Sequence, residues 1–402
     1  MTPIALKTLH ELLSQVTGYI YPNEIEIYWS ILIVIYPYLT GLVAGAFILA
    51  SLVKVFNVKE LQGTYRLSLL TALSFLLIAP FPLLLHLSWP MRSFEIFLTP
   101  NLTSAMAMFG FVYAWYLMGV LLLEIWFEYR RDLIVMARRE RPPMSWIHRA
   151  LSLFSHDVSD KAIAFDKKAI RVITIIGIPS AFLLHGYVGF IFGSVKANPW
   201  WSSVLMPIVF LMSAIVSGIA MVLLLYMIIT LVRNETIDMK CIDKIVTYLF
   251  YAVIVDFSLE ALDFIHRLYE SEESVKILGE LISLKLFMNL VVLQVLLGML
   301  VPLGILIFVK LRRVTDDLRK LLYFTSAILI QMGIFATRWN VVIGGQLFSK
   351  SFRGLMTYKM EITGIEGLLT SLVLLILPFI ILGVLLRILP TKRLDETATT
   401  TT

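Results

Sequence analysis

The sequence predicts an all-α integral membrane protein with about nine transmembrane helices, and three observations support this prediction. Of the 402 residues, 59% are hydrophobic and only 15% are charged, and the mean hydropathy is +0.86. A water-soluble protein of this length could not bury so much apolar surface. Apolar runs of about 20 residues, the length that crosses a bilayer, recur along the chain. Lys and Arg collect in alternate loops between these runs.

The predicted helices fall into two groups. The first group has four helices (29–195) and the second has five (196–390), and a long polar loop, 128–166, links the third helix to the fourth. Apolar residues at helical spacing in residues 1–28 predict a short amphipathic segment on the outer face. Residues 391–402 form a polar cytoplasmic tail, and no soluble domain is expected. The predicted spans are 29–53, 67–87, 102–127, 170–192, 204–232, 245–265, 278–309, 321–337 and 367–386.

The distribution of charge predicts the orientation. The loops after the first, third, fifth, seventh and ninth helices carry most of the Lys and Arg residues, whereas one alternate loop holds Glu270, Glu272 and Glu273. Loops rich in Lys and Arg remain on the cytoplasmic side. We therefore expect a multi-pass protein of the cell (plasma) membrane, with the N-terminus outside and the C-terminus in the cytoplasm.

Composition excludes several kinds of cofactor and partner. The one cysteine, Cys241, cannot form an internal disulfide or hold an iron–sulfur cluster by itself. The formal net charge of +6 is explained by the cytoplasmic loops, so no nucleic acid partner is expected.

Histidines near the outer membrane face are candidate functional residues. His86 ends the second predicted helix, and His185 lies beside Tyr187 on a helix face made bare by Gly186, Gly189 and Gly193. An imidazole and a phenol could hold the oxygens of a quinone and exchange its protons. Two alternatives remain open, namely a bis-histidine haem between His86 and His185, and histidines that only bond neighbouring helices. The bare face fits either a flat ring or a closely packed helix.

The sixth predicted helix contains acidic residues on one face. Asp256, Glu260 and Asp263 follow the i, i+4, i+7 spacing of an α-helix. Each ionised carboxylate costs about 3 kcal/mol at bilayer depth unless it is paired, protonated or hydrated. Equal rise along the hairpin to the next helix places Lys285 level with Glu260 and Asn289 level with Asp256. These five residues are predicted to form either a proton path or a structural ion pair.

Five segments of the chain match a known family in sequence and in order: IYPYLTGLVAGAF (35–47), APFPLLLHLSWPMR (79–92), PNLTSAMAMFGF (100–111), the stretch 185–218 that begins HGYVGF, and TRWNVVIGGQ (337–346). Together they resemble the NrfD-like family, whose members include the membrane anchor subunits of polysulfide reductase and related respiratory molybdenum enzymes. The resemblance extends from the first predicted helix to the eighth.

The resemblance implies two stacked four-helix bundles, so that the ninth helix is an extra C-terminal helix. It also implies a bound menaquinone-like quinone, an iron–sulfur (ferredoxin-like) partner subunit on the outer face and a molybdopterin catalytic subunit. The chain itself is then expected to hold no haem, no iron–sulfur cluster and no other metal. Some relatives have a histidine at the start of the first helix, where this chain offers Glu26 or Tyr28 instead. Arg92 and Arg338 are expected to dock the partner. The quinone site implied by the resemblance comprises Asn23, Glu26, Tyr28, Trp29, His86, His185 and Tyr187.

We therefore expect a membrane anchor of the sulfur or polysulfide reductase type. It would pass electrons between quinol and the partner iron–sulfur subunit, with proton translocation as a further expectation. The alternative is an ion- or proton-coupled secondary transporter that uses the acidic face of the sixth helix. The sequence shows neither an inverted repeat nor a matched pair of broken helices, which such a transporter would require.

Overall fold

The computed structural model describes residues 27–99, 101, 103–270, 275–349, 354–392 and 394. This part of the chain is helical apart from its connections and one isolated antiparallel bridge between Phe348 and Leu355. Nine of the described helices are long and apolar enough to cross a bilayer, as the sequence predicts. The predicted amphipathic segment lies almost entirely outside the described residues.

The helices follow one another with short connections, and two spans contain a π-helical section, in which each backbone bond closes over five residues. The sections η4 and η5 join their α-helical neighbours into continuous spans. The elements are α2 (Ile31–Lys54), η2 (Lys59–Leu61), α3 (Gln62–Ile78), α4 (Phe81–His86), η3 (Pro90–Arg92), α5 (Glu95–Leu98), α6 (Ala105–Ala114), η4 (Trp115–Leu122), α7 (Leu123–Arg139), α8 (Met144–Leu151), α9 (Asp160–Gly193), α10 (Met206–Val232), α11 (Met239–Glu270), α12 (Val275–Leu281), η5 (Ile282–Leu300), α13 (Val301–Leu311), α14 (Asp316–Val342), η6 (Gly344–Gln346) and α15 (Leu368–Ile388).

The eighth span is longer than the sequence predicts. Its predicted end at residue 337 is wrong, because α14 continues to Val342. Arg338 and Asn340 lower the hydropathy of this stretch, yet both side chains are buried against neighbouring helices rather than exposed in a loop. Buried partners allow polar residues inside a membrane helix.

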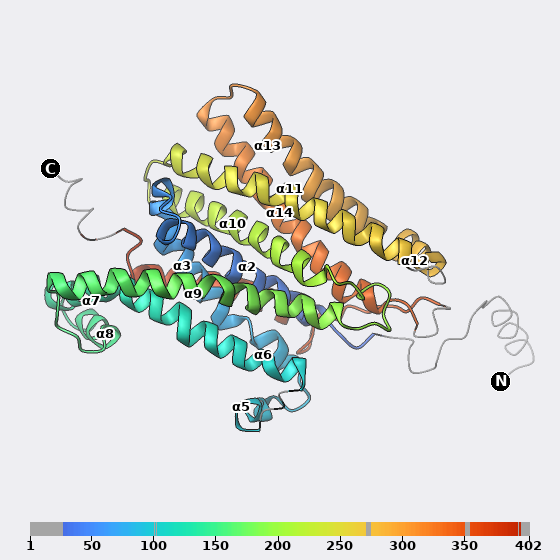
Figure 1. The fold of residues 1–402 in the computed structure, drawn as a ribbon, viewed down its shortest axis with the longest axis horizontal. Coiled ribbons are helices and arrows are strands. Elements are labelled where there is room, and N and C mark those ends of the chain that lie inside the picture. The colour runs from blue at the N-terminus through green and yellow to red at the C-terminus, as the bar shows by residue number, and fades with distance from the viewer. Residues whose placement is uncertain are drawn as a thin grey trace, which may run out of the picture.

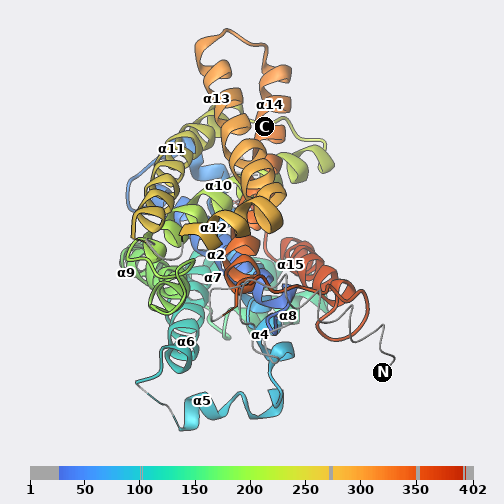
Figure 2. The ribbon, with the colours of Figure 1, turned by 90° about the vertical axis from the view of Figure 1, so that its right-hand side faces the viewer.

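The spans lie side by side with α2 and α10 at the centre (Figure 1). The helix α2 packs against α3, α9, α10 and α14, and α10 packs against α11 as well. The last helix, α15, packs against α3 and α2, although it follows the second group in the sequence. Figure 2, which looks along the helices, shows α15 on the side away from α9 and α11.

Two glycines permit the closest contact between the groups. A Cβ atom built on Gly218 of α10 would lie 2.4 Å from the Cα of Gly45 on α2. No real Cβ atom fits at that distance, so both positions require glycine. Small residues of this kind let membrane helices approach closely and gain van der Waals contact.

A charged cluster joins the helices at the end that the sequence predicts to be cytoplasmic. Glu128 of α7 accepts hydrogen bonds from Lys54 and Arg66, both at 3.0 Å, and Arg66 also pairs with Asp132 at 2.7 Å. Arg66 further donates to the backbone oxygens of Pro390 and Lys392. The cluster therefore fixes the end of α15 to α3 and α7.

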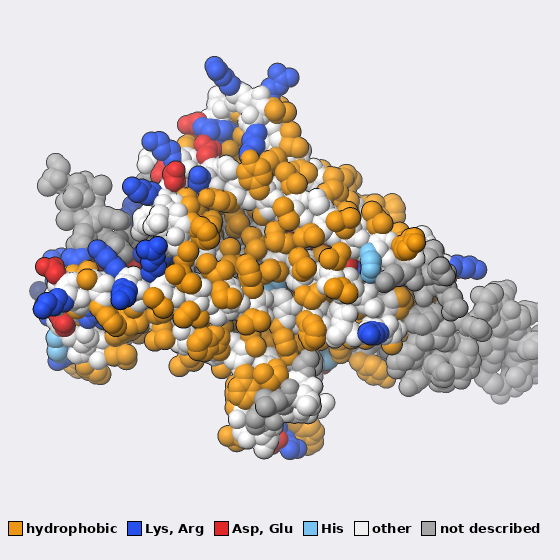
Figure 3. Space-filling model, viewed as in Figure 1, with side chains coloured by type: hydrophobic (Ala, Val, Ile, Leu, Met, Phe, Trp, Pro, Cys, Tyr) orange, Lys and Arg blue, Asp and Glu red, His pale blue; other side chains and the backbone are white. Residues whose placement is uncertain are grey.

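The surface has the pattern of a membrane protein. Hydrophobic side chains cover the middle of the face in Figure 3, whereas Lys and Arg gather at the end that carries α7 and at the tip beyond α13. An apolar belt bounded by polar ends matches the hydrocarbon core of a bilayer and its two interfaces.

We predict that Gly218→Ala destabilises the protein by about 1–3 kcal/mol, because the new methyl group meets backbone atoms of α2. The midpoint of thermal unfolding of the detergent-purified protein should fall. Gly304→Ala is the matched control, since a Cβ atom on Gly304 meets nothing within 4 Å. An equal midpoint for the two variants would contradict the predicted contact.

Candidate functional site

A buried arginine lies between the two helix groups. Arg338 of α14 is 0% exposed, and its Nη2 atom donates to Ser213 Oγ at 2.6 Å and to the Phe210 carbonyl oxygen at 3.4 Å. Its guanidinium carbon lies 4.2 Å from the centre of the Phe210 ring. A guanidinium cannot lose its proton in a protein, so this charge must be compensated inside the membrane.

The contacts of His185 fix its tautomer. Its Nε2 atom lies 3.2 Å from Arg338 Nη2, and its Nδ1 atom lies 3.2 Å from Thr40 Oγ1. Arg338 can only donate, so Nε2 accepts and the proton is on Nδ1. His185 is 0% exposed and packs against Gly41 of α2. In this arrangement His185 has no free ring nitrogen for a quinone or a haem iron.

Two carboxylates provide the charge opposite Arg338. Asp256 and Glu260 of α11 both interact electrostatically with the guanidinium. Asp256 is 2% exposed, and its Oδ1 atom has no hydrogen-bond partner. Arg338 Nε and Nη1 are also without a partner. The two carboxylates of α11 therefore attract the Arg338 guanidinium of α14 without a direct hydrogen bond to it.

Glu260 begins a short chain of polar side chains. Its Oε2 atom accepts from Gln294 Nε2 at 2.8 Å, and Gln294 Oε1 accepts from Asn340 Nδ2 at 2.7 Å. The predicted pair of Glu260 with Lys285 is wrong, because Lys285 is exposed and Gln294 occupies that place. The prediction assumed α-helical rise after the hairpin, but η5 is π-helical and advances less per residue.

Asp263, the third residue of the acidic face, has a structural role. Its carboxylate accepts from Ser203 and Arg267, and Arg267 also donates to the backbone oxygen of Trp200. This ion pair joins α11 to the segment before α10. Asn289 does not join Asp256; it lines a separate cavity of about 680 Å³ between η5, α14 and α15.

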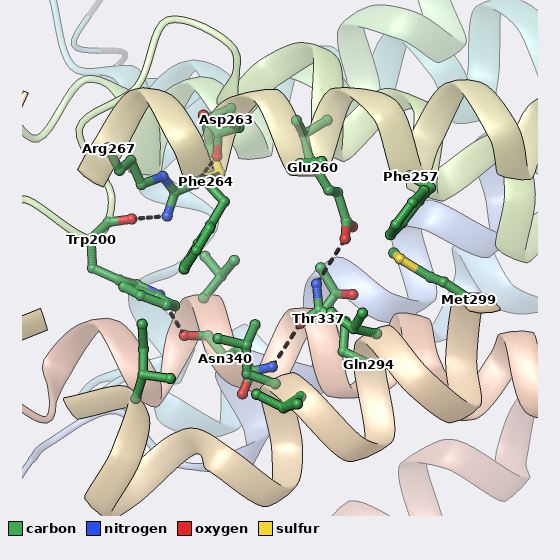
Figure 4. Close-up of a pocket in the computed structure, with 18 residues that line it drawn as sticks. Trp200, Phe257, Glu260, Asp263, Phe264, Arg267, Gln294, Met299, Thr337 and Asn340 are labelled. Carbon is green, nitrogen blue, oxygen red and sulfur yellow. Dashed lines mark hydrogen bonds and ion pairs between the residues drawn. The ribbon is translucent and has the colours of Figure 1, made fainter. Parts of the chain in front are cut away.

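A cavity of about 380 Å³ opens beside Glu260, between α11, η5 and α14. Figure 4 shows Glu260 pointing from α11 into this space, with Phe257 and Phe264 on either side. Gln294 and Asn340 lie on the opposite wall. Its volume lies within the usual range for a small-molecule site, about 300–1,000 Å³.

Tyr187 lies in a separate aromatic niche, which we define as Tyr36, Phe109 and Tyr187. The Phe109 ring lies 5.2 Å from the Tyr36 ring and 6.4 Å from the Tyr187 ring, measured between centroids. The two phenol groups interact electrostatically, and both hydroxyl oxygens are buried without a hydrogen-bond partner. Unsatisfied buried hydroxyls indicate a place for a ligand or an ordered water.

The start of α2 is covered by other segments. Trp29 stacks on Trp201 at 5.5 Å, and its backbone N–H donates to Gln346. The Ile31 N–H donates to the hydroxyl of Tyr358 at 3.0 Å, and burial raises the pKa of Tyr358. Tyr28 is 77% exposed. The other two predicted residues of this region, Asn23 and Glu26, lie outside the described residues.

Two further predicted residues, His86 and Arg92, lie at the end of α4 and in the connection from α4 to α6. His86 Nδ1 lies 3.0 Å from Glu366 Oε2, so this histidine bonds the segment before α15 rather than His185. Arg92 is exposed and pairs with Glu95 at 2.8 Å. The prediction that Arg338 docks a partner is wrong, since a side chain with no exposed surface cannot contact another protein.

The predicted quinone-site residues thus occupy four places instead of one. His185 joins Arg338, Tyr187 joins the aromatic niche, Trp29 joins Trp201, and His86 joins Glu366. The bare face of α9 contacts the start of α10, because a Cβ atom on Gly189 would lie 2.7 Å from the Met206 oxygen. Close helix packing therefore explains this glycine, rather than a flat ring.

Sequence reasoning missed the residues that complete these clusters: Thr40, Ser213, Gln294 and Asn340 around Arg338 and Glu260, and Tyr36 and Phe109 around Tyr187. One feature of the sequence could have indicated the contact between Arg338 and the acidic residues. An arginine within reach of the eighth span requires acidic partners at the same depth, and the sixth span supplies them.

We predict that Arg338→Met lowers the free energy of unfolding by about 3–5 kcal/mol, because it leaves buried carboxylates uncompensated. Adding Asp256→Asn should restore part of this loss, which thermal unfolding of the four proteins of the double-mutant cycle measures. Arg387→Met, at an exposed arginine of α15, is the control. Strictly additive losses would show that Arg338 and Asp256 do not interact.

Comparison with known proteins identifies the family. Residues 22–350 match the family described as Polysulphide reductase, NrfD. The C subunit of the selenate reductase of Mesobacillus selenatarsenatis is 34% identical over 207 residues, which are 49% of this chain and 47% of that protein. The putative dimethyl sulfoxide reductase membrane subunit of Halobacterium salinarum is 28% identical over 204 residues, 48% and 42% of the two chains.

Protein NrfD of Escherichia coli is 26% identical over 200 residues, which are 49% of this chain and 58% of that protein. The chain therefore matches these curated relatives over about half of their length. The family match, in contrast, covers most of the chain and eight of the nine spans found among the described residues. The protein therefore belongs to the polysulphide reductase NrfD family and is a multi-pass membrane protein.

Proposed function

We propose that this chain is the quinone-reactive membrane subunit of a respiratory reductase complex of the sulfur or polysulfide reductase type. Relatives named as subunits of a selenate reductase and of a dimethyl sulfoxide reductase support this proposal. A menaquinone-like quinol gives its electrons to a partner iron–sulfur subunit, which passes them to a molybdopterin catalytic subunit. The protons of the quinol are released within this chain.

The aromatic niche is the proposed place of quinol oxidation. The observation that carries this assignment is the pair of buried, unpartnered hydroxyls of Tyr36 and Tyr187. Each phenol can donate to a quinone oxygen and accept from a quinol hydroxyl, while Phe109 contacts both tyrosine rings. His185 is not a direct ligand in this proposal, because Thr40 and Arg338 occupy its ring nitrogens.

Arg338, Asp256 and Glu260 form the proposed proton route. The three groups lie inside the membrane-spanning part, where ionisable side chains are costly and commonly serve transport of protons. Each of them has an unpartnered polar atom that a water molecule could bridge. Asp263 is already bound to Arg267 and Lys285 is exposed, so neither belongs to the route.

The outer connection between α4 and α6 is the proposed docking segment for the partner. Trp89, Met91 and Leu98 are 74%, 85% and 70% exposed, and Arg92 lies among them. In Figure 2 the α5 segment stands away from the helices. We place this end outside the cell because few Lys and Arg residues occur there. Labelling of single cysteines at Met91 and Leu153 in intact cells, in a Cys241→Ala background, tests this orientation.

Purification in mild detergent tests the assignment as a whole. We expect a cysteine-rich iron–sulfur subunit and a molybdopterin subunit to co-purify with the chain, and solvent extraction to release a menaquinone-like lipid. The visible spectrum of the isolated chain should lack a haem band near 410 nm, roughly the position of haem absorption in general. A solitary polypeptide without quinone would favour the secondary transporter instead.

Tyr187→Phe should lower quinol oxidation by the assembled complex about tenfold, because one hydrogen bond to the reacting ring is lost. The measurement is the rate of quinol oxidation at saturating electron acceptor. Tyr251→Phe is the matched control, since Tyr251 is 59% exposed on α11. If a Tyr36→Phe/Tyr187→Phe double variant turns over like this control, the niche is not the quinol site.

Asp256→Asn should leave quinol oxidation largely intact but reduce proton translocation in sealed vesicles, because an amide cannot carry a proton through the route. The readout is the ratio of protons translocated to quinol oxidised. Glu280→Gln, at an exposed glutamate of α12, is the control. An unchanged ratio, or loss of the assembled protein alone, would leave Asp256 with a structural role.

A further inference from the structure

We infer that the cavity beside Glu260 is a second binding site, for the hydroxyl-bearing aromatic ring of a lipid-soluble hydroquinone. This inference goes beyond the proposed function, which places quinol oxidation in the aromatic niche. The two sites share no residue: the niche is built from α2, α6 and α9, and the cavity from α10, α11, η5 and α14. Each site can therefore be occupied whether or not the other is.

The shape and walls of the cavity suit a flat apolar ring. Its volume is about 380 Å³, and aromatic surface comes from Phe257 at one end and from Phe264 and Trp200 toward the other. Aliphatic side chains of η5, including Val291 and Met299, complete the lining. Sites for small ligands typically combine such apolar walls with a few fixed polar groups.

The polar groups of the cavity specify the hydrogen bonds of the ligand. Glu260 Oε1 and Asn340 Oδ1 are both buried and have no partner, and Asn340 as a whole is 2% exposed. Gln294 holds both residues in place, since it donates to the other oxygen of Glu260 and accepts from the Asn340 amide. With Glu260 ionised, the two free atoms are acceptors, so the matching ligand is a donor.

This requirement distinguishes a hydroquinone from other lipids. Hydroquinone hydroxyls can donate to Glu260 and Asn340, whereas the carbonyl oxygens of an oxidised quinone cannot. An acyl chain fills apolar space but leaves both acceptors unsatisfied, which is costly in a buried site. The cavity also lies among surfaces that face lipid, because Leu262 and Phe287 on neighbouring turns are 56% and 52% exposed.

Photolabelling of the intact purified complex tests the inference. The probe is a naphthohydroquinone that carries a trifluoromethyl diazirine as its photoreactive group and is kept reduced by dithionite, and labelled peptides are mapped by mass spectrometry. We expect label on α11 and η5. Val291→Trp fills the cavity and should lower this label at least tenfold. Leu296→Trp on the same helix, 46% exposed and outside the lining, should not.

Competition identifies the chemistry that is recognised. A methylnaphthohydroquinone should protect the α11 and η5 peptides about tenfold better than its dimethyl ether, which lacks donors, since a hydrogen bond to a charged group is worth about 1.5 kcal/mol or more. Equal protection by the ether or by phospholipid would show an unspecific lipid cavity and overturn the inference. So would equal labelling of the Val291→Trp and Leu296→Trp variants.

The labelled peptides separate this inference from the proposed function. Label on α11 and η5 without label near Tyr187 supports the second site and contradicts quinol binding in the aromatic niche. Label near Tyr187 alone supports the niche and overturns the second site. Absence of label at both places overturns both assignments.

Discussion

The buried charge of Arg338 is the constraint on which the centre of this protein depends. A guanidinium that stays charged inside a bilayer requires polar contacts and opposite charge at the same depth. The structure meets this requirement from three directions: Ser213 on α10, His185 on α9, and the carboxylates of α11. Those three helices come from both helix groups. The groups are therefore joined at the centre by electrostatics as well as by close packing.

The same constraint explains why His185 and the acidic residues differ from simple site ligands. A neutral His185 accepts from Arg338, whereas a doubly protonated ring would place two positive groups together. Asp256 and Glu260 compensate the charge of the guanidinium. This requirement alone accounts for their positions, whether or not they also transport protons. Proton movement through this cluster would have to preserve that balance at every step, which favours exchange between near neighbours over long separations of charge.

The sequence was sufficient for the fold class and for the nine spans that the described part of the chain contains, because twenty apolar residues in a row have few alternatives. It was less reliable where polar residues enter a span. Arg338 and Asn340 resembled the start of an outer loop, and only their contacts with other helices show that α14 continues. A hydropathy value describes one residue type by itself, so it does not account for contacts with other helices. Family resemblance pointed to Tyr187 as a site residue, but not to its neighbours Tyr36 and Phe109, which come from distant segments.

Which residue of η5 lies level with which residue of α11 also could not be predicted from the sequence. Counting residues from a hairpin assumes equal rise in both helices, and a π-helical section breaks that assumption. Gln294, rather than Lys285, then meets Glu260. π-Helical sections occur frequently at functional sites, and here η5 forms one wall of the cavity.

The enclosure of α2 has a consequence for biosynthesis. In its most apolar 18-residue window, 94% of the residues are buried, although α2 precedes in the chain every helix that surrounds it. During membrane insertion it must wait beside lipid or an insertase until α10 and α14 have been translated. Its contact surface, with Gly45 at the closest point, is therefore completed late. Errors in the later spans would leave the earliest one without partners and expose the nascent chain to quality control.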